Sequence, residues 1–196
     1  SNNSIRVTDA FLKAVEEDAD WELIRRTNGE VAKTIKARDL WEQVGHAAWA
    51  CADPGIQYDD TINDWHTNPE TGRINASNPC SEYMSLDDSS CNLASLNLMT
   101  FLKEDDTFDA ERFAKSVEFV ITAMDISISF ADFPTEAIGD TTRRYRQLGI
   151  GYANLGALLM ATGLPYDSDA GRSFAAAITS LMTGTAYKRS AELAGV

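Results

Sequence analysis

The stretch Asn78-Pro79-Cys80-Ser81-Glu82 is the most informative part of the sequence for both fold and function, and Cys91-Asn92-Leu93 follows closely behind it. It places a thiol between a carboxamide and a carboxylate, each two residues away. In an extended segment, residues two apart point to the same side, so we expect Asn78, Cys80 and Glu82 to face one substrate together. A reactive sulfur, a carboxylate that takes a proton and an amide that holds an oxygen suit chemistry on a polyhydroxylated molecule.

The surroundings of Cys80 distinguish it from an ordinary cysteine, which is usually a small buried hydrophobic residue. Most of its immediate neighbours are polar, and Pro79 fixes the approach of the backbone. Residues 56–90 are also rich in turn signals, and a loop-rich stretch of this length in a compact domain is more often functional than idle. We therefore interpret Cys80 as a candidate functional residue. Cys91 either shares a cavity with Cys80 or simply lies in a strand.

Composition excludes several classes of protein. Seventeen basic residues against thirty acidic ones give a formal charge of −13, which argues against a nucleic-acid partner because such surfaces need clustered Lys and Arg. Three cysteines are too few for a secreted disulfide framework, and no apolar run reaches transmembrane length. We expect a cytoplasmic protein with no membrane partner. The sequence stops directly after a helical pattern, so we also expect a fragment.

The hydrophobic pattern predicts a helix-rich α/β chain without an internal domain boundary. Helices are predicted over about 8–18, 37–52, 110–130, 135–161 (with interruptions) and 167–194, and strands over 21–24 and from 91 into a turn near 102. Gly149 and Gly151 invite comparison with a dinucleotide-binding loop, but Asn154 stands at the third glycine position. We expect Gly149, Gly151 and Gly156 to allow close packing of a buried helix.

Two other kinds of site use the same residue types. Cysteine and histidine are zinc ligands, but the available residues lack the short C-x₂₋₄-C pairs that hold the metal efficiently: Cys51, His66, Cys80 and Cys91. Alternatively, His66 and Asn78 support Cys80 in a cysteine-hydrolase arrangement. Nothing in the local sequence is specific to either kind of site.

The motif over 78–82, together with Cys91-Asn92-Leu93-Ala94-Ser95-Leu96-Asn97-Leu98, resembles the active-site segment of the ribonucleotide reductase large chain. The adenosylcobalamin-dependent branch (class II) fits best. Three further stretches also resemble this family, and they extend the likeness over nearly the whole chain: Asn3-Ser4-Ile5-Arg6-Val7-Thr8, Asp53-Pro54-Gly55-Ile56-Gln57-Tyr58 and Tyr145-Arg146-Gln147-Leu148-Gly149-Ile150-Gly151-Tyr152-Ala153-Asn154-Leu155-Gly156. The resemblance implies that residues 1–196 belong to a single catalytic domain. They would be a partial segment of a ten-stranded α/β barrel that carries the radical cysteine on a loop.

The resemblance also implies roles for individual residues. Cys80 would become a thiyl radical, Glu82 would be the base on the substrate 3′-hydroxyl, and Asn78 would hydrogen-bond the sugar oxygens. Cys91 would be one half of the dithiol that supplies two electrons. The nucleotide site would be lined by the whole motif: Asn78, Pro79, Cys80, Ser81 and Glu82. Adenosylcobalamin would be the cofactor, although the resemblance assigns no residue of this chain to hold it.

The function implied is reduction of ribonucleotides to deoxyribonucleotides for DNA replication, by a thiyl-radical mechanism with dithiol oxidation. The implied partners are a ribonucleotide substrate, a thioredoxin-type reductant and, for the full-length protein, a second copy in a homodimer. Two alternatives stay open. A class I large chain would draw its radical from a metal-bearing partner subunit, and a scaffold module derived from the barrel would bind without turnover. We expect residues 1–196 alone to be inactive.

Overall fold

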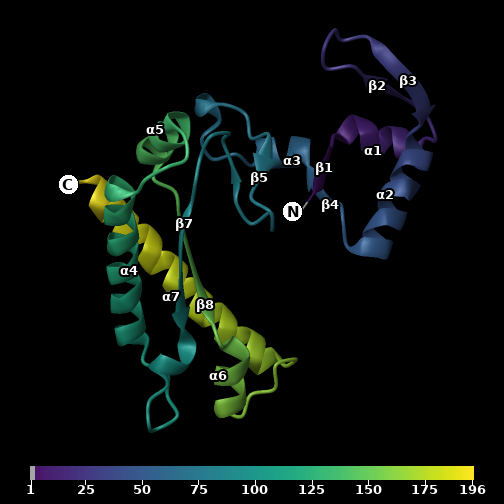
Figure 1. Cartoon of the computed structure of the whole chain (residues 1–196). Helices are drawn as coiled ribbons and strands as arrows, with labels where there is room; N and C mark the ends of the chain where they lie inside the picture. Colours follow the sequence, from purple (N-terminus) through teal and green to yellow (C-terminus); the bar gives the residue numbers. More distant parts are fainter. Residues whose placement is uncertain (1–2) are drawn as a thin grey trace. The chain divides into compact units, whose positions relative to one another are not determined.

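The computed structural model describes residues 3–196, and it confirms a helix-rich mixture of helices and short strands (Figure 1). The contacts divide the chain into an N-terminal unit that ends at Asp87 and a C-terminal unit that begins at Asp88. The strands of residues 3–196 form four separate two-stranded sheets, and none of these sheets closes into a barrel. No helix in this part of the chain has both the length and the apolar character needed to cross a membrane.

The N-terminal unit alternates short strands with helices. Its elements are β1 (Ser4–Val7), α1 (Asp9–Glu16), β2 (Asp20–Ile24), β3 (Val31–Lys36), α2 (Ala37–Cys51), β4 (Gly55–Tyr58), α3 (Asp59–Asp64), a 3₁₀ turn (Pro69–Thr71), β5 (Ala76–Ser77) and β6 (Met84–Ser85). Strands β1 and β4 pair in parallel, whereas β2 with β3 and β5 with β6 pair antiparallel. The predicted helices near 8–18 and 37–52 and the predicted strand over 21–24 are confirmed.

A small apolar cluster holds the first part of this unit. The Thr8 hydroxyl accepts a hydrogen bond from the Phe11 N–H at 3.2 Å, which satisfies one of the donors exposed at the start of α1. Phe11 is buried, and the rings of Trp21 and Trp41 meet it edge-on at centroid distances of 5.2 and 6.2 Å. Helix α1 is thus held on the hairpin and on α2 by aromatic contacts.

The predicted loop-rich stretch over 56–90 was wrong at its start. Residues 55–58 form β4, because their backbone pairs with β1 in the register Ile5 to Ile56 and Arg6 to Gln57. Helix α3 follows directly. The partner strand lies about fifty residues earlier in the chain, so local sequence carries no sign of this pairing.

The C-terminal unit packs two long helices against a parallel pair of strands. Its elements are β7 (Asn92–Asn97), a 3₁₀ turn (Leu98–Phe101), α4 (Ala110–Phe130), α5 (Glu136–Tyr145), β8 (Leu148–Ala153), α6 (Leu155–Ala161) and α7 (Asp169–Ala194). The strand predicted from residue 91 and the helices predicted over 110–130 and 167–194 are confirmed. Leu98, Phe113, Val117 and Leu158 are fully buried at the centre of the core.

The prediction of an interrupted helix over residues 135–161 was wrong for the middle of this range. Residues 148–153 form β8, which pairs in parallel with β7 over its whole length, from Asn92 with Leu148 to Asn97 with Ala153. Gly149 and Gly151 therefore lie in a strand and not in a buried helix. A side chain at position 149 would collide with Leu93 on the neighbouring strand. The glycine thus leaves room for the Leu93 side chain on the neighbouring strand, which is a requirement of this sheet and not of helix packing.

Candidate active site

The motif around Cys80 forms the loop of a very short hairpin. Strands β5 and β6 share only two residue pairs, and residues 78–83 connect them. Asn78 closes this loop: its N–H donates to the Tyr83 carbonyl at 3.3 Å, and its Oδ1 accepts from the Tyr83 N–H at 3.0 Å. The Ser81 N–H also donates to the Asn78 carbonyl at 3.1 Å. Cys80 and Glu82 are both exposed on this loop.

The extended backbone that we expected for this motif was wrong. Residues 79 and 80 form a turn, and Ser81 follows in the left-handed region with φ of 62°. Side chains alternate between two faces only in an extended strand, so the two-residue spacing does not by itself put the thiol, amide and carboxylate on one face. Their convergence on one substrate stays a prediction. Asn78 nevertheless has a structural role that sequence reasoning missed, because its side chain closes the loop.

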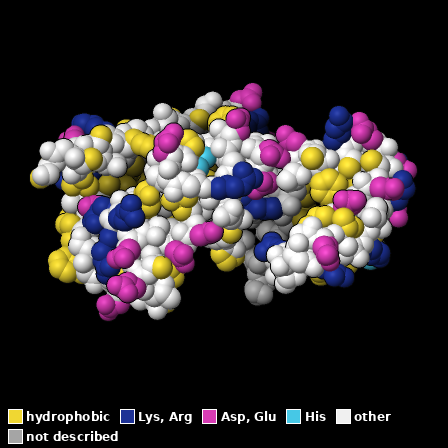
Figure 2. Space-filling model, turned by 90° about the horizontal axis from the view of Figure 1, so that it is seen from above, with side chains coloured by type: hydrophobic (Ala, Val, Ile, Leu, Met, Phe, Trp, Pro, Cys, Tyr) yellow, Lys and Arg dark blue, Asp and Glu magenta, His cyan; other side chains and the backbone are white. Residues whose placement is uncertain are grey.

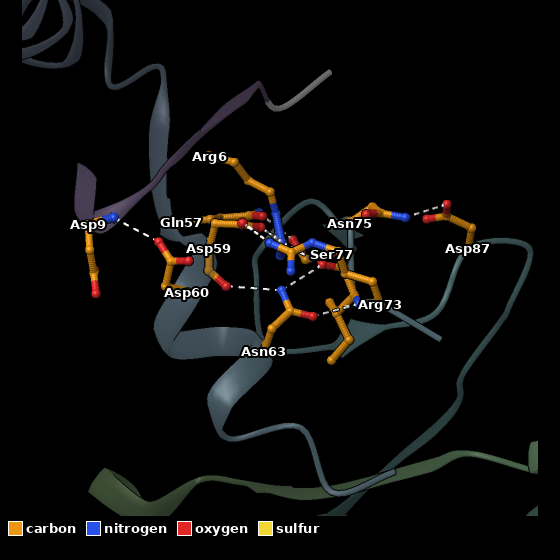
Figure 3. A network of polar contacts seen from close by, with 11 residues as sticks. Arg6, Asp9, Gln57, Asp59, Asp60, Asn63, Arg73, Asn75, Ser77 and Asp87 are labelled. Carbon is orange, nitrogen blue, oxygen red and sulfur yellow. Dashed lines mark hydrogen bonds and ion pairs between the residues drawn. The ribbon is translucent and has the colours of Figure 1, made fainter. Parts of the chain in front are cut away.

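A buried polar network holds the chain just before this hairpin (Figure 3). Asp59, at 9% exposure, accepts a hydrogen bond from Arg6 Nη1 at 3.0 Å and a second from Arg73. Arg6 Nη1 also donates to the Ile74 carbonyl at 2.8 Å. Asn63 binds both backbone groups of Ile74, accepting from its N–H at 2.9 Å and donating to its carbonyl at 3.1 Å. Residue 74 is therefore fixed two positions ahead of β5.

Cys91 belongs to the C-terminal unit and directly precedes β7. It is half-buried, and its Sγ lies 3.8 Å from the Asn92 carbonyl oxygen. The Asn92 side chain donates to the Met124 carbonyl at 3.0 Å, so the start of the strand is tied to α4. A Cβ atom at Gly149 would lie 3.5 Å from Cys91 Sγ, which places the thiol beside the glycine of β8. A shared cavity with Cys80 stays a prediction.

A cavity of about 600 Å³ opens in the C-terminal unit among α4, β8 and α7. Its polar wall holds Arg146, whose Nε donates to Asp125 Oδ1 at 2.7 Å. This hydrogen bond raises the pKa of the Arg146 guanidinium, and the negative charge of Asp125 adds to the effect. None of the residues predicted for the active site lines this cavity.

The zinc and hydrolase alternatives gain no support from the structure. No group of three or more His, Cys, Asp and Glu side chains able to hold a metal ion lies within residues 3–196. Both nitrogens of His66 have backbone partners: Nδ1 accepts from the Asn68 N–H at 3.4 Å, and Nε2 lies 3.1 Å from the Gly72 carbonyl. The ring is thus engaged locally and is not directed at Cys80.

Figure 2 shows acidic and basic side chains interspersed over the face drawn.

Comparison with known proteins gives a consistent result over the whole chain. Residues 1–196 match the family described as "Ribonucleotide reductase, barrel domain". The vitamin B12-dependent ribonucleotide reductase of Streptomyces avermitilis is 70% identical over 200 residues, which cover 100% of this chain and 21% of the relative. The protein of the same description from Agrobacterium fabrum is 53% identical, over 100% of this chain and 15% of the relative.

A more distant relative carries a more detailed description. The vitamin B12-dependent ribonucleoside-diphosphate reductase of Mycobacterium tuberculosis is 38% identical over 168 residues, which cover 86% of this chain and 24% of that protein. The chain thus spans about a fifth of the length of the curated relatives it matches.

Proposed function

The chain belongs to the ribonucleotide reductase barrel-domain family, and we propose that it is the segment of a reductase catalytic chain that carries the radical cysteine. The observation that carries this proposal is 70% identity to a vitamin B12-dependent reductase across the whole of residues 1–196. The reaction would convert a ribonucleotide to a deoxyribonucleotide. Two electrons from a dithiol would leave a disulfide, and the 2′-hydroxyl would leave as water.

Cys80 is the residue proposed to begin the chemistry. Its thiyl radical would remove the hydrogen from C3′ of the sugar, because the S–H bond formed is comparable in strength to an activated sugar C–H bond. The position at an exposed turn supports this role, since the sulfur must reach a substrate carbon. At the end of the cycle the Cys80 S–H would return a hydrogen atom to C3′, which regenerates the radical.

Glu82 and Asn78 are proposed to act on the sugar hydroxyls. Glu82 is exposed on the same loop, and as a carboxylate it would take the proton of the 3′-hydroxyl. Loss of this proton makes the C3′ radical a better electron donor, which helps to expel the 2′-hydroxyl. The Oδ1 of Asn78 is engaged by Tyr83, whereas its Nδ2 has no protein partner within residues 3–196 and can donate to a sugar oxygen.

Cys91 is proposed as one half of the reducing dithiol. The departing 2′-hydroxyl needs a proton, and the deoxygenated sugar radical needs reduction; a pair of thiols supplies both and ends as a disulfide. The half-buried position of Cys91 at the start of β7 is compatible with a thiol that must be re-reduced from outside. A thioredoxin-type protein is the proposed reductant, and we assign no residue of this chain as the second thiol.

Adenosylcobalamin, a form of vitamin B12, is the proposed cofactor, and the relatives are described as vitamin B12-dependent reductases. When bound, it would supply the radical that oxidises the Cys80 thiol. The exposure of Cys80 fits this requirement, because a thiol oxidised by a bulky external group has to be accessible. We assign no residue among 3–196 to holding the cofactor.

The full-length protein with Cys80→Ser tests the proposal. Deoxyribonucleotide formation would be assayed from ribonucleoside di- and triphosphates with a dithiol, with and without adenosylcobalamin. We expect cobalamin-dependent product that falls by at least about 10³-fold in the variant, because a serine O–H is too strong to form the radical. Cys51→Ser is the matched control, since Cys51 is exposed at the end of α2 and its thiol donates only to nearby carbonyls.

Four other results would contradict parts of the proposal. Activity that requires a metal-bearing partner subunit instead of cobalamin would assign the protein to class I. Equal activity in the parent and the Cys80 variant would show that Cys80 is not the radical cysteine. Absence of turnover under any condition would favour a scaffold module. Turnover by the isolated 196-residue chain would contradict our expectation that this segment needs the rest of the protein.

A further inference from the structure

Gln57 makes two hydrogen bonds that span the Cys80 turn, and we propose that it is the positioning residue of this turn. Its side chain comes from β4 and is 4% exposed. Its Nε2 donates to Ser77 Oγ at 2.7 Å and to Ser81 Oγ at 3.2 Å. These serines lie on either side of residues 78–80, so one buried amide holds both ends of the turn. The inference rests on the proposed function, because it concerns how Cys80 is presented to a substrate.

The hairpin cannot fix the turn by itself. Strands β5 and β6 form only two residue pairs, and an isolated two-stranded hairpin is marginally stable at best. Ser81 also adopts φ of 62°, a conformation that costs energy for any residue with a Cβ and persists only where the surroundings impose it. Cys80 is exposed, so apolar packing does not supply this constraint. The hydrogen bond from Gln57 to Ser81 supplies this constraint at the residue with the unfavourable backbone conformation.

The hydrogen-bond directions require a donor at position 57. The Ser77 hydroxyl has two acceptors for its single proton, the Asn78 carbonyl at 2.7 Å and Ser81 Oγ at 3.2 Å. The oxygen of Ser77 is then left to accept, and the amide N–H of Gln57 supplies the proton. The Asn78 carbonyl also receives the Ser81 N–H. Gln57, Ser77, Asn78 and Ser81 therefore form one chain of bonds around the turn.

Gln57 is itself held on a fixed frame. In the parallel pairing of β1 with β4, its register partner is Arg6. Arg6 binds the carbonyl of Ile74, and Gln57 binds the hydroxyls of Ser77 and Ser81. The two side chains at one register position thus hold residues 74–81 near both ends, and Figure 3 shows Arg6, Gln57 and Ser77 close together. The paired strands β1 and β4 pack on the apolar cluster through Ile5, Val7 and Ile56, and they determine where the turn is held.

The test compares Gln57→Met with Gln43→Met in the full-length protein. Methionine keeps the length and volume of glutamine but cannot donate a hydrogen bond. Gln43 is exposed on α2, outside this network, so it offers the same chemical change without the bonds. In Gln57→Met we expect kcat to fall about 100-fold, because a misplaced reacting group costs that much. KM should stay within about threefold, since the loss concerns the reacting sulfur more than binding.

Hydrogen exchange distinguishes positioning from general destabilisation. In Gln57→Met we expect faster exchange in the peptide that covers residues 76–85, with no change in peptides from α1 and α2. Adding Ser77→Ala to Gln57→Met should lower kcat by less than the product of the two single effects, because both changes remove the hydrogen bond between Gln57 and Ser77. Wild-type kcat in Gln57→Met, exchange that accelerates across the whole N-terminal unit, or an additive double variant would each overturn the proposal.

The order of measurements separates this inference from the function on which it rests. Product from the parent and none from Cys80→Ser supports the proposed function, whatever Gln57→Met does. If the parent makes no product, the proposed function fails, and hydrogen exchange alone decides whether Gln57 positions the turn. Unchanged exchange over 76–85 in Gln57→Met would then overturn the structural part of the inference as well.

Discussion

The two units of this chain differ in the kind of contact that stabilises each of them internally. The C-terminal unit has an extended apolar core, which the 3₁₀ turn after β7 and the helices α4, α6 and α7 build: Leu98, Phe101, Phe113, Val117, Ile121, Met124, Leu158, Ile178 and Met182. The buried apolar cluster of the N-terminal unit is much smaller: Val7, Phe11, Ala14 and Ala37. Within residues 3–196, three of the four buried polar residues lie in the N-terminal unit (Gln57, Asp59 and Ser85), and the fourth, Thr142, lies in the C-terminal unit.

The two kinds of contact have different effects: apolar burial mainly stabilises a unit, and polar contacts mainly fix the geometry of a loop. Apolar burial stabilises a fold without a preferred direction, whereas a hydrogen bond weakens steeply when its angle or distance changes. The loop that carries Cys80 needs a defined position more than a large free energy, and directional contacts from Gln57, Asn78 and the Arg6–Asp59 pair provide it. We infer that changes in the apolar core act on stability and that changes in the polar network act on the loop.

The largest effect on stability is expected from Phe113→Ala. Phe113 is fully buried, and the rings of Phe101 and Phe108 meet it edge-on at 5.1 and 5.3 Å. Its loss should lower the free energy of opening of the C-terminal unit by about 3–5 kcal/mol, measured by native-state hydrogen exchange of amides in α4. Phe119→Ala is the control on the same helix, because Phe119 is 75% exposed; we expect a change within about 0.5 kcal/mol. Equal losses would contradict the assigned core.

A smaller, more local effect is expected from Asp59→Asn. The change removes the charge that Arg6 and Arg73 share, but the amide oxygen still accepts one hydrogen bond and Arg6 keeps the Ile74 carbonyl. We expect a loss of about 2 kcal/mol in the opening free energy, confined to residues 59–77 and measured by hydrogen exchange. Asp64→Asn, on the exposed side of the same helix, should leave exchange unchanged. A loss spread over α1 and α2 would show that the network supports the whole unit.

Sequence patterns predicted the elements whose signals are local. The helix that begins after Thr8 and the long helices over 110–130 and 167–194 carry caps and apolar periodicity in their own residues, and the structure confirms them. The strands β4 and β8 were missed because each depends on a parallel partner far away in the chain. Pairing of this kind leaves no local alternation when the segment is short and rich in glycine, as residues 148–153 are.

In the candidate site, too, some features were predictable from the sequence and others were not. The family resemblance identified Cys80 and its neighbours, but residue spacing gave the wrong backbone, because the left-handed conformation of Ser81 is not encoded by alternation. The support around the loop was invisible in the sequence. Arg6, Gln57 and Asp59 come together only when β1 and β4 pair, and none of them stands out by residue type alone.

The smallest effect on stability is expected at Asp105 in the C-terminal unit. Like Asp59, the Asp105 carboxylate accepts two hydrogen bonds, but it is exposed to solvent. Asp105 Oδ1 accepts from the Thr107 hydroxyl at 2.6 Å and from the Thr107 N–H at 3.1 Å, in an exposed turn. These bonds, the hydroxyl first, lower the pKa of Asp105 below its usual value, because they favour the charged form. A depressed pKa adds stability above the unfolded pKa of about 3.9, and this stability is lost as pH falls through the folded pKa.

Thr107→Val tests this contrast between an exposed and a buried carboxylate. The variant removes the hydroxyl but keeps the N–H, so the pKa of Asp105 should rise toward its usual value, as measured by NMR titration of the carboxyl group. Thr100→Val is the control, because the Thr100 hydroxyl donates to the Asn97 carbonyl and not to Asp105. Hydrogen exchange at neutral pH should change only slightly in Thr107→Val, and only near residues 105–107, unlike in Asp59→Asn, since solvent replaces most of the lost bond. A pKa that does not move in Thr107→Val would mean that the backbone N–H alone holds the carboxylate.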